Sequence, residues 1–138
     1  MKAALVINGE RLTRGDLLDA SNPGTANPVT SGVERVLVAQ YGRQEGLHLA
    51  DEQFRSIVEN IRRQQAVATD DEFAVLLRQE GLTADVLRQR LERQMINERL
   101  KLRTASDVDW LRLIAFLRDR ADIQWHDAPL RDSYNTGK

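Results

Sequence analysis

Between residues 31 and 103 the chain alternates amphipathic segments with strong helix-stop signals, and this pattern constrains the fold more than any other feature. Apolar side chains recur at helical spacing in four successive segments. Two of the breaks repeat one arrangement, in which Gly46-Leu47 and Gly81-Leu82 are each followed by a new helix cap. Glycine ends helices readily because it adopts a positive φ without steric cost. The pattern therefore predicts a compact run of antiparallel helices.

The predicted helices begin at residues that can cap a helix N-terminus. The expected caps are Ser31, Asp51, Thr69, Thr83 and Ser106. Ser31 and Thr69 are each followed three residues later by Glu, which is the spacing of a capping box. The second segment has the clearest apolar face, which follows the i, i+3, i+4, i+7 template. The members of this face are Phe54, Ile57, Val58 and Ile61.

Strand-like patterns stand near both ends of the chain. Ala4-Leu5-Val6-Ile7 is a short β-prone run, and Asn8-Gly9 after it is a strong hairpin signal because both residues tolerate a positive φ. Residues 121–125 alternate apolar and polar side chains, and their expected partner is the N-terminal strand. The predicted fold class is mainly α, a bundle of about five to six helices with a small β-element formed by the N-terminal strand or strands and a C-terminal strand.

The length of 138 residues favours a single domain. We assign residues 1–126 to one helical domain that includes a loop at 20–30, where Asn22-Pro23-Gly24 and Asn27-Pro28 are turn sequences. Residues 127–138 are mostly polar and contain Pro129, so they are expected to form a loose C-terminal tail.

The segment after Ser106 is apolar over more than half of its circumference. Its apolar positions are Val108, Trp110, Leu111, Leu113, Ile114, Phe116 and Leu117. An ordinary surface helix has a single apolar stripe. This helix is therefore predicted either to lie at the centre of the core or to be covered partly by a partner.

The composition offers little for catalysis, metal binding or cofactor binding. Cys is absent, and His48 and His126 have no acidic neighbour at ligand spacing. The eight Gly residues are scattered and form no phosphate-binding loop. The acidic run Asp70-Asp71-Glu72 is expected to interact with a helix dipole. The sequence therefore predicts no catalytic residue, no metal ligand and no cofactor.

The charge does not favour a nucleic-acid partner, since the formal net charge is -1 and the pI is about 6.1. The densest basic run consists of Arg88, Arg90, Arg93, Arg99, Lys101 and Arg103. Acidic residues in the same segment, such as Glu92 and Glu98, predict a solvated helix face. A nucleic-acid-binding face is the weaker alternative.

The first ten residues do not have the pattern of a signal peptide, because the apolar run is too short. No segment approaches the roughly 20 apolar residues needed to cross a bilayer, so membrane insertion is not expected. The expected localisation is periplasmic if a signal peptide was removed from the chain, and cytoplasmic otherwise.

The order of these motifs resembles the N-terminal chaperone module of the SurA family, periplasmic chaperones related to parvulin-type prolyl isomerases. Residues 6–16 are similar to the family's opening strand, its Asn-Gly-Glu turn and its first short helix. Residues 47–53 are similar to the kinked entry to an acidic-capped helix. Residues 73–82 resemble the short helix that ends in a Gly-Leu turn, and residues 88–96 resemble the long helix that follows.

One departure limits what this resemblance implies. In the wider family a parvulin domain commonly follows the long helix, and a last helix and strand then return to the N-terminal module. Here only Thr104-Ala105 separates the predicted long helix from Ser106, and residues 110–123 still resemble the returning helix and strand. Because no room remains for an isomerase domain, isomerase activity is not carried over, and the chain is not expected to be an enzyme.

The resemblance implies a non-catalytic, ATP-independent chaperone or escort module that binds unfolded or extended polypeptide in an apolar groove. The very apolar last helix favours the same function, because a peptide groove needs exposed apolar side chains rimmed by polar ones. Aromatic side chains bury large areas, and Met adapts to varied partners. The candidate groove residues are Leu37, Tyr41, Met95, Trp110 and Phe116. A place in the core is the alternative for each of them.

Two other hypotheses stay open. The chain fits a dedicated accessory or maturation subunit for one partner protein, and a helical nucleic-acid-binding protein is a weaker alternative. Self-association is a further hypothesis, because the loop at 20–30 would permit two chains to form a homodimer by exchanging elements.

Overall fold

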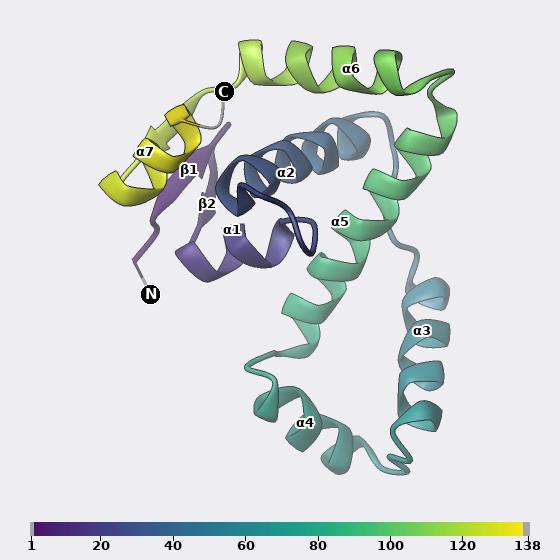
Figure 1. Ribbon diagram of the computed structural model, residues 1–138. Coiled ribbons are helices and arrows are strands. Elements are labelled where there is room, and N and C mark those ends of the chain that lie inside the picture. The colour runs from purple at the N-terminus through teal and green to yellow at the C-terminus, as the bar shows by residue number, and fades with distance from the viewer. Residues whose placement is uncertain (1, 137–138) are drawn as a thin grey trace.

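The computed structural model describes residues 2–136 and shows a mainly helical protein with a small antiparallel sheet (Figure 1). This confirms the predicted fold class. The strands are β1 (Leu5–Ile7), β2 (Glu10–Leu12) and β3 (Ile123–Trp125). The helices are α1 (Arg14–Ala20), α2 (Pro28–Gln44), α3 (Asp51–Gln64), α4 (Asp70–Gln79), α5 (Ala84–Arg103), α6 (Asp107–Arg120) and α7 (Ala128–Thr136).

The sheet joins the two ends of the chain. β1 lies in the middle and pairs antiparallel with β2 on one side and β3 on the other. The tight turn between β1 and β2 is made by Asn8 and Gly9, whose φ angles of 49° and 86° are both positive. The Asn8 side chain also accepts a hydrogen bond from the backbone N–H of Asp122, at 2.8 Å. The predicted hairpin and the predicted pairing of the C-terminal strand are both confirmed.

The sheet, α1, α2 and α7 enclose the main core, and we call this part of the molecule the body. Leu5, Ile7, Leu17 and Val33 are completely buried there. Helices α1 and α2 approach each other closely at Gly32, where an added Cβ would lie 2.3 Å from the backbone oxygen of Leu17. A larger side chain at this position would therefore separate the two helices.

The predicted loose tail is wrong for residues 127–136, which belong to the body. They form α7, and Leu130 and Tyr134 are 1% and 4% exposed. The Asp127 side chain accepts a hydrogen bond from the backbone N–H of Leu130, and the ring of Tyr134 lies 5.4 Å from the ring of Trp125. Leu130 and Tyr134 are four residues apart, so they lie on the same face of α7, and both belong to the main core.

Two predicted caps are also wrong. Helix α2 begins at Pro28, with Asn27 as its cap, because Pro suits the first helical position and the Asn27 side chain accepts from the Thr30 N–H. The loop therefore ends before residue 28, and Ser31 lies inside the helix. Helix α3 is capped at Ala50 rather than at Asp51, and the Gln53 side chain accepts from the Ala50 N–H. The predicted caps at Thr69, Thr83 and Ser106 are confirmed.

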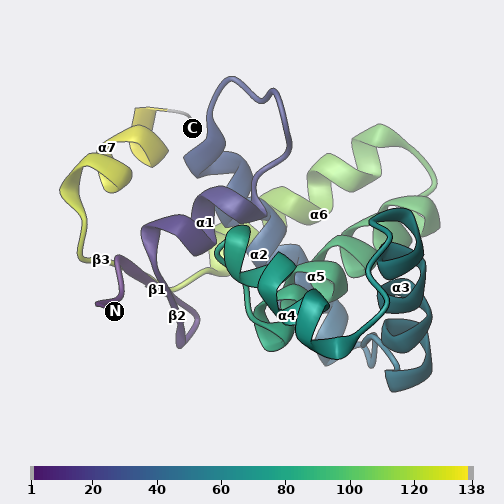
Figure 2. The same ribbon diagram turned by 90° about the horizontal axis from the view of Figure 1, so that it is seen from below.

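Helices α3 and α4 and the first half of α5 (84–92) project away from the body, and we call them the arm. In both views α3 lies at the opposite end of the molecule from α7 (Figures 1 and 2). No residue of α3 is buried, and α4 buries only Leu77. The arm is therefore much more open than the body.

Three turns of one type shape the arm. Residues at positive φ end α2, α3 and α4: Gly46 at 88°, Ala66 at 54° and Gly81 at 71°. In each turn the following residue donates a backbone hydrogen bond of 2.8 Å to the carbonyl five residues before it, as in a Schellman motif. The turns at Gly46 and Gly81 were predicted, whereas the turn at Ala66 was missed because Ala is not a residue that typically occupies this conformation.

Helix α5 connects the arm to the body by crossing α2. At the crossing an added Cβ on Gly42 would lie 2.2 Å from Cγ2 of Ile96, which is completely buried. Ile96 belongs to a second, smaller core with Val38, Leu47 and Leu100. None of the helices in the described part of the chain is both long and apolar enough to span a bilayer.

Candidate polypeptide-binding surface

The structure does not bring the five predicted groove residues together. Leu37 is only 2% exposed and belongs to the main core. Tyr41, Met95 and Trp110 are partly buried around the second core. Phe116 is 48% exposed on α6, and the Arg120 guanidinium lies 4.2 Å from the centre of its ring. Leu37 is thus unavailable at the surface. Tyr41, Met95 and Trp110 lie around the same core cluster, and Phe116 is not part of it.

Helix α6 has apolar side chains on two faces, which explains its unusual composition. Trp110, Ile114 and Leu117 pack against the cores. Val108 and Leu111 on the outer face are 57% and 63% exposed. No residue of α6 is buried, so this helix does not lie at the centre of the core. Its outer face is an open apolar surface.

The second open surface lies on the arm. The sequence predicted the apolar stripe of α3, but these residues were not among the predicted groove residues. The side chains on this arm face are partly exposed apolar residues of α3 and α4. They are Phe54, Ile57, Val58, Ile61, Phe73 and Leu76. The stripe itself was visible in the sequence, but its exposure depends on how little of the chain packs against it.

A cavity of about 510 Å³ opens beside α3 on the arm. Phe54 and Val58 form its apolar part, and Arg55, Glu59 and Arg62 contribute charged groups. Arg88 of α5 closes one side, with its guanidinium 5.3 Å from the centre of the Phe54 ring. The lining of this cavity therefore contains apolar side chains and charged groups of both signs.

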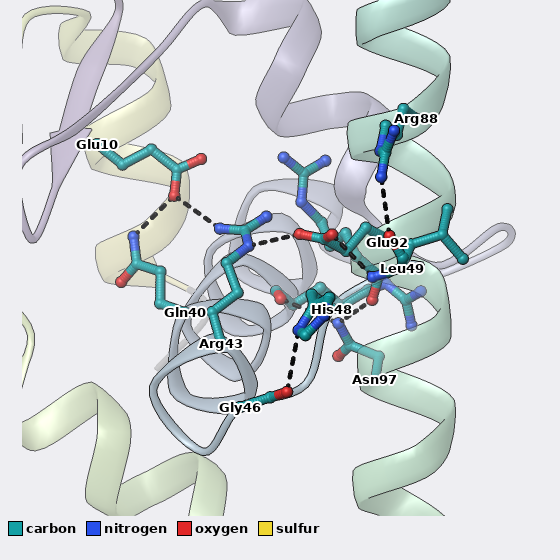
Figure 3. Close-up of polar contacts among 11 residues, drawn as sticks. Glu10, Gln40, Arg43, Gly46, His48, Leu49, Arg88, Glu92 and Asn97 are labelled. Atoms are coloured by element: carbon teal, nitrogen blue, oxygen red, sulfur yellow. Dashed lines mark hydrogen bonds and ion pairs between the residues drawn. The ribbon is translucent and has the colours of Figure 1, made fainter. Parts of the chain in front are cut away.

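Glu92, at the end of the arm segment of α5, links the arm to the body through hydrogen bonds (Figure 3). One carboxylate oxygen accepts from Nε of Arg43 in α2, and the other accepts from the backbone N–H of Leu49, both at 3.0 Å. Arg43 also lies 3.7 Å from Glu10, which accepts a hydrogen bond from Gln40. Burial opposes ionisation of Glu92, but the hydrogen bonds from Leu49 and Arg43 are together stronger and lower its pKa.

The basic run on α5 does not form one free cationic face. Arg88 pairs with Asp51, and Arg90 pairs with Asp19 at 2.6 Å. Arg93 is buried, with 8% of its surface exposed. Arg99, Lys101 and Arg103 stay exposed near the end of the helix. Three of the six basic side chains are thus either paired with a carboxylate or buried.

The described residues contain no group of three or more potential metal-binding side chains from His, Asp, Glu or Cys. A ring nitrogen of His48 lies 3.1 Å from the carbonyl oxygen of Gly46, where it stabilises the turn between α2 and α3. Asp70, in the acidic first turn of α4, pairs with Arg62 at 2.8 Å. These groups have local structural partners.

Comparisons of the chain with protein-family models, curated proteins and solved structures gave no match. A function can therefore be inferred only from the surfaces described above. Two of them are apolar and open, namely the arm face and the outer face of α6.

Proposed function

We propose that the protein is a non-catalytic, ATP-independent chaperone or escort module that binds unfolded or extended polypeptide. The observation that supports this proposal most directly is the low burial of the arm face. Its main element, α3, is a 14-residue amphipathic helix in which no residue is buried. The apolar side chains of the arm face are partly exposed and have charged neighbours. Apolar patches rimmed by polar groups are typical of surfaces that bind other polypeptides. A bound segment would remove this face from water and supply the packing that the arm lacks.

The charges beside the arm face favour a tolerant rather than a selective surface. Arg55 and Arg62 lie near Glu59 at the same cavity, so no strong field of one sign is present. Clients with different net charges would therefore bind through their apolar side chains. The open packing of α3 and α4 would also let the arm adjust to clients of different shape.

The resemblance to the SurA chaperone module is part of this proposal. Its support is the order of the elements, in which a hairpin and a short helix precede the long helices and β3 returns to β1. The chain passes from α5 to α6 through residues 104–106, so no domain stands between them. The proposed activity is accordingly binding without prolyl isomerisation.

The proposal is tested by measuring the aggregation of several chemically unfolded proteins at near-equal molar ratio. We expect the unchanged chain to suppress aggregation, because it covers exposed apolar segments of the client. The double variant Phe54→Ser/Val58→Ser should lose most of this effect. The matched control Val108→Ser/Leu111→Ser changes exposed apolar residues outside the arm and should keep it. Absence of suppression by the unchanged chain for every client would overturn the proposal.

A second candidate function is a dedicated accessory subunit for one partner protein, and the outer face of α6 favours it. Val108 and Leu111 are more exposed than any residue of the arm face, since each has more than half of its surface in solvent. Pull-down from the native cell distinguishes the two functions. One stoichiometric partner that is lost in Val108→Ser/Leu111→Ser would favour the accessory subunit, whereas many weak partners that are lost in the arm variant would favour the chaperone.

Two weaker alternatives have direct tests. A nucleic-acid-binding protein would show salt-sensitive binding to DNA or RNA. Arg88 and Arg90 are already paired with carboxylates, so we expect no such binding. A homodimer would be seen by light scattering as a species heavier than the 15.7 kDa chain.

A further inference from the structure

The outer face of α6 is a continuous stripe of exposed side chains that recur at helical spacing. The members of this stripe are Val108, Leu111, Arg112, Ala115, Phe116 and Asp119. Figure 1 shows α6 along one edge of the molecule, with no other element of the described chain on its outer side. The opposite side of the helix packs on the cores through Trp110, Ile114 and Leu117. The stripe is therefore held at the surface by a packed helix.

The apolar part of the stripe is exposed to solvent. Val108, Leu111 and Phe116 are 57%, 63% and 48% exposed. Ala115 is also exposed, and its side chain is a single methyl group. A contact along this face would remove these groups from water, which favours association.

The stripe also has one charge of each sign. The side chain of Arg112 is 78% exposed and lies 4.0 Å from Asp109, at the limit of an ion pair. Asp119 is exposed and forms no ion pair within residues 2–136. The two charges are seven residues apart, so they lie on the same line of the helix, on either side of Ala115 and Phe116.

Two copies of this face are complementary when their α6 helices run antiparallel about a two-fold axis. In such a contact both copies use the same patch, and each pair of contacting residues occurs twice. Antiparallel helices bring Arg112 of one copy toward Asp119 of the other, whereas parallel helices would place the two Arg112 side chains together. Helical side chains lean toward the N-terminus of their own helix, so in antiparallel helices Arg112 and Asp119 lean toward each other.

We infer that the outer face of α6 binds the same face of a second copy of this chain, with the two helices antiparallel. Leu111 of one copy would lie over Ala115 of the other, a large side chain against a small one. An unrelated partner does not require opposite charges on both sides of the apolar centre of the face, whereas a second copy does. This inference goes beyond the proposed function, which uses the arm face, and it requires no exchange of elements between chains.

The expected dimer dissociates on dilution. A helix of 14 residues is about 21 Å long, and a contact along one such helix is smaller than the roughly 1,600 Å² of a standard interface. Sedimentation equilibrium of the full chain between about 1 μM and about 1 mM covers the range of weak association. We expect the mass to rise from 15.7 kDa to twice this value. A chain that stays monomeric throughout would overturn the inference and leave the face to a different protein.

Leu111→Ser should raise the dissociation constant of the dimer at least tenfold, because it removes the largest exposed apolar contact of the stripe. An unchanged dissociation constant would show that the chains associate elsewhere, for example by exchange of elements, and would overturn the inference. Phe54→Ser/Val58→Ser changes the arm face and should still dimerise while it loses suppression of aggregation. The failure of either proposal is thus separately visible.

The charges provide a test that a change in folding cannot imitate. Arg112→Asp and Asp119→Arg each place like charges at both symmetric contacts, so each variant alone should dimerise at least tenfold more weakly. An equimolar mixture of these two variants restores opposite charges at both contacts and should dimerise like the unchanged chain.

The control Asp71→Arg reverses an exposed acid on α4 and should leave the dimer unchanged. A mixture that stays as monomeric as its components would contradict the antiparallel arrangement. If circular dichroism shows that a charge variant does not fold, the concentration dependence of the unchanged chain and of Leu111→Ser decides.

Discussion

The body and the arm are built from similar amphipathic helices but bury them to very different degrees. In the body α2 has nine buried residues, and the sheet and α7 close the core around it. In the arm α3 has none and α4 has one. An apolar stripe is therefore not sufficient for burial, because it also needs opposing elements. The body has opposing elements on several sides, whereas the arm contacts the rest of the chain mainly along α5.

The difference is useful for a protein that binds other polypeptides. Local stability follows buried apolar contacts, so a poorly packed region opens more readily than a well-packed one. Under the proposed function, the body would stay folded while the arm changes its conformation to fit a bound polypeptide. The same contrast places a close-packed α2–α5 crossing in the body and a loosely packed surface at the far end of the molecule.

The largest effect is expected from a matched pair of Leu→Ala changes in the two regions. Leu17 in the body is completely buried, so Leu17→Ala should lower the free energy of unfolding by about 3 kcal/mol or more. Leu76 on the arm is only partly buried, so Leu76→Ala should cost about 1 kcal/mol. Urea unfolding measures both. Equal losses would show that the arm is packed as tightly as the body.

A smaller effect is expected at Gly42, where α5 leaves the arm and crosses α2. Gly42→Ala would place Cβ 2.2 Å from Ile96, and this overlap should outweigh the gain in helix propensity, for a net loss of about 1–2 kcal/mol. The control Gly46→Ala meets no atom within 4 Å and should lose about 1 kcal/mol through its positive φ alone. Thermal unfolding distinguishes them, and a more stable Gly42→Ala chain would show that the crossing tolerates a shift.

The connection between the two regions is tested at Glu92. Glu92→Gln removes charge-assisted hydrogen bonds to Arg43 and Leu49 and should cost about 1 kcal/mol at neutral pH. Because the folded-state pKa of Glu92 lies below its ordinary value of 4.5, this contribution is present above that pH and is lost as the pH falls through the folded-state pKa.

Unfolding of Glu92→Gln and of the unchanged chain as a function of pH checks this expectation. The stability difference should shrink in acid, and amide exchange in α3 should rise in the variant at neutral pH. The control Glu98→Gln changes an exposed carboxylate on the same helix and should have little effect. A pH-independent difference would contradict the role given to the Glu92 charge.

The smallest effect, of opposite sign, is expected at the turn between α3 and α4. Ala66 adopts a φ of 54°, which costs a residue with a Cβ about 1 kcal/mol, so Ala66→Gly should stabilise the chain by about 0.5–1 kcal/mol. The control Ala74→Gly lies inside α4 and should destabilise the chain by a similar amount. Thermal unfolding of both variants gives the comparison. Destabilisation by Ala66→Gly would show that the Ala66 side chain makes contacts that outweigh its strain.

Much of the architecture could be predicted because the relevant signals are local. Gly46 and Gly81 end helices through their own backbone freedom, and Asn8-Gly9 forms its turn for the same reason. Thr69, Thr83 and Ser106 cap helices through hydrogen bonds that span three residues. The start of α2 was predicted wrongly because Asn27 and Ser31 are both good caps, and Pro28 selected the earlier one.

Other features were decided by tertiary structure, since the same residue pattern fits more than one environment. Leu37 and Phe116 were equally good candidates for a client-facing surface, but the packing of the body buries one and leaves the other exposed. Leu130 and Tyr134 lie in the segment that was predicted to be a loose tail, and the structure places both in the main core. Periodicity records which face of a helix is apolar and contains no information on what covers it.

The sequence by itself determined where the helices stop, how the N-terminal hairpin turns and that the terminal strands could pair. These properties depend on φ preferences, short-range hydrogen bonds and alternation along the chain. Only the tertiary structure decided that the stripe of α3 stays open and that Arg93 is buried without a hydrogen-bond partner for its Nε atom. Burial and polar pairing depend on segments distant in sequence, so they are fixed only when the body, the arm and α5 come together.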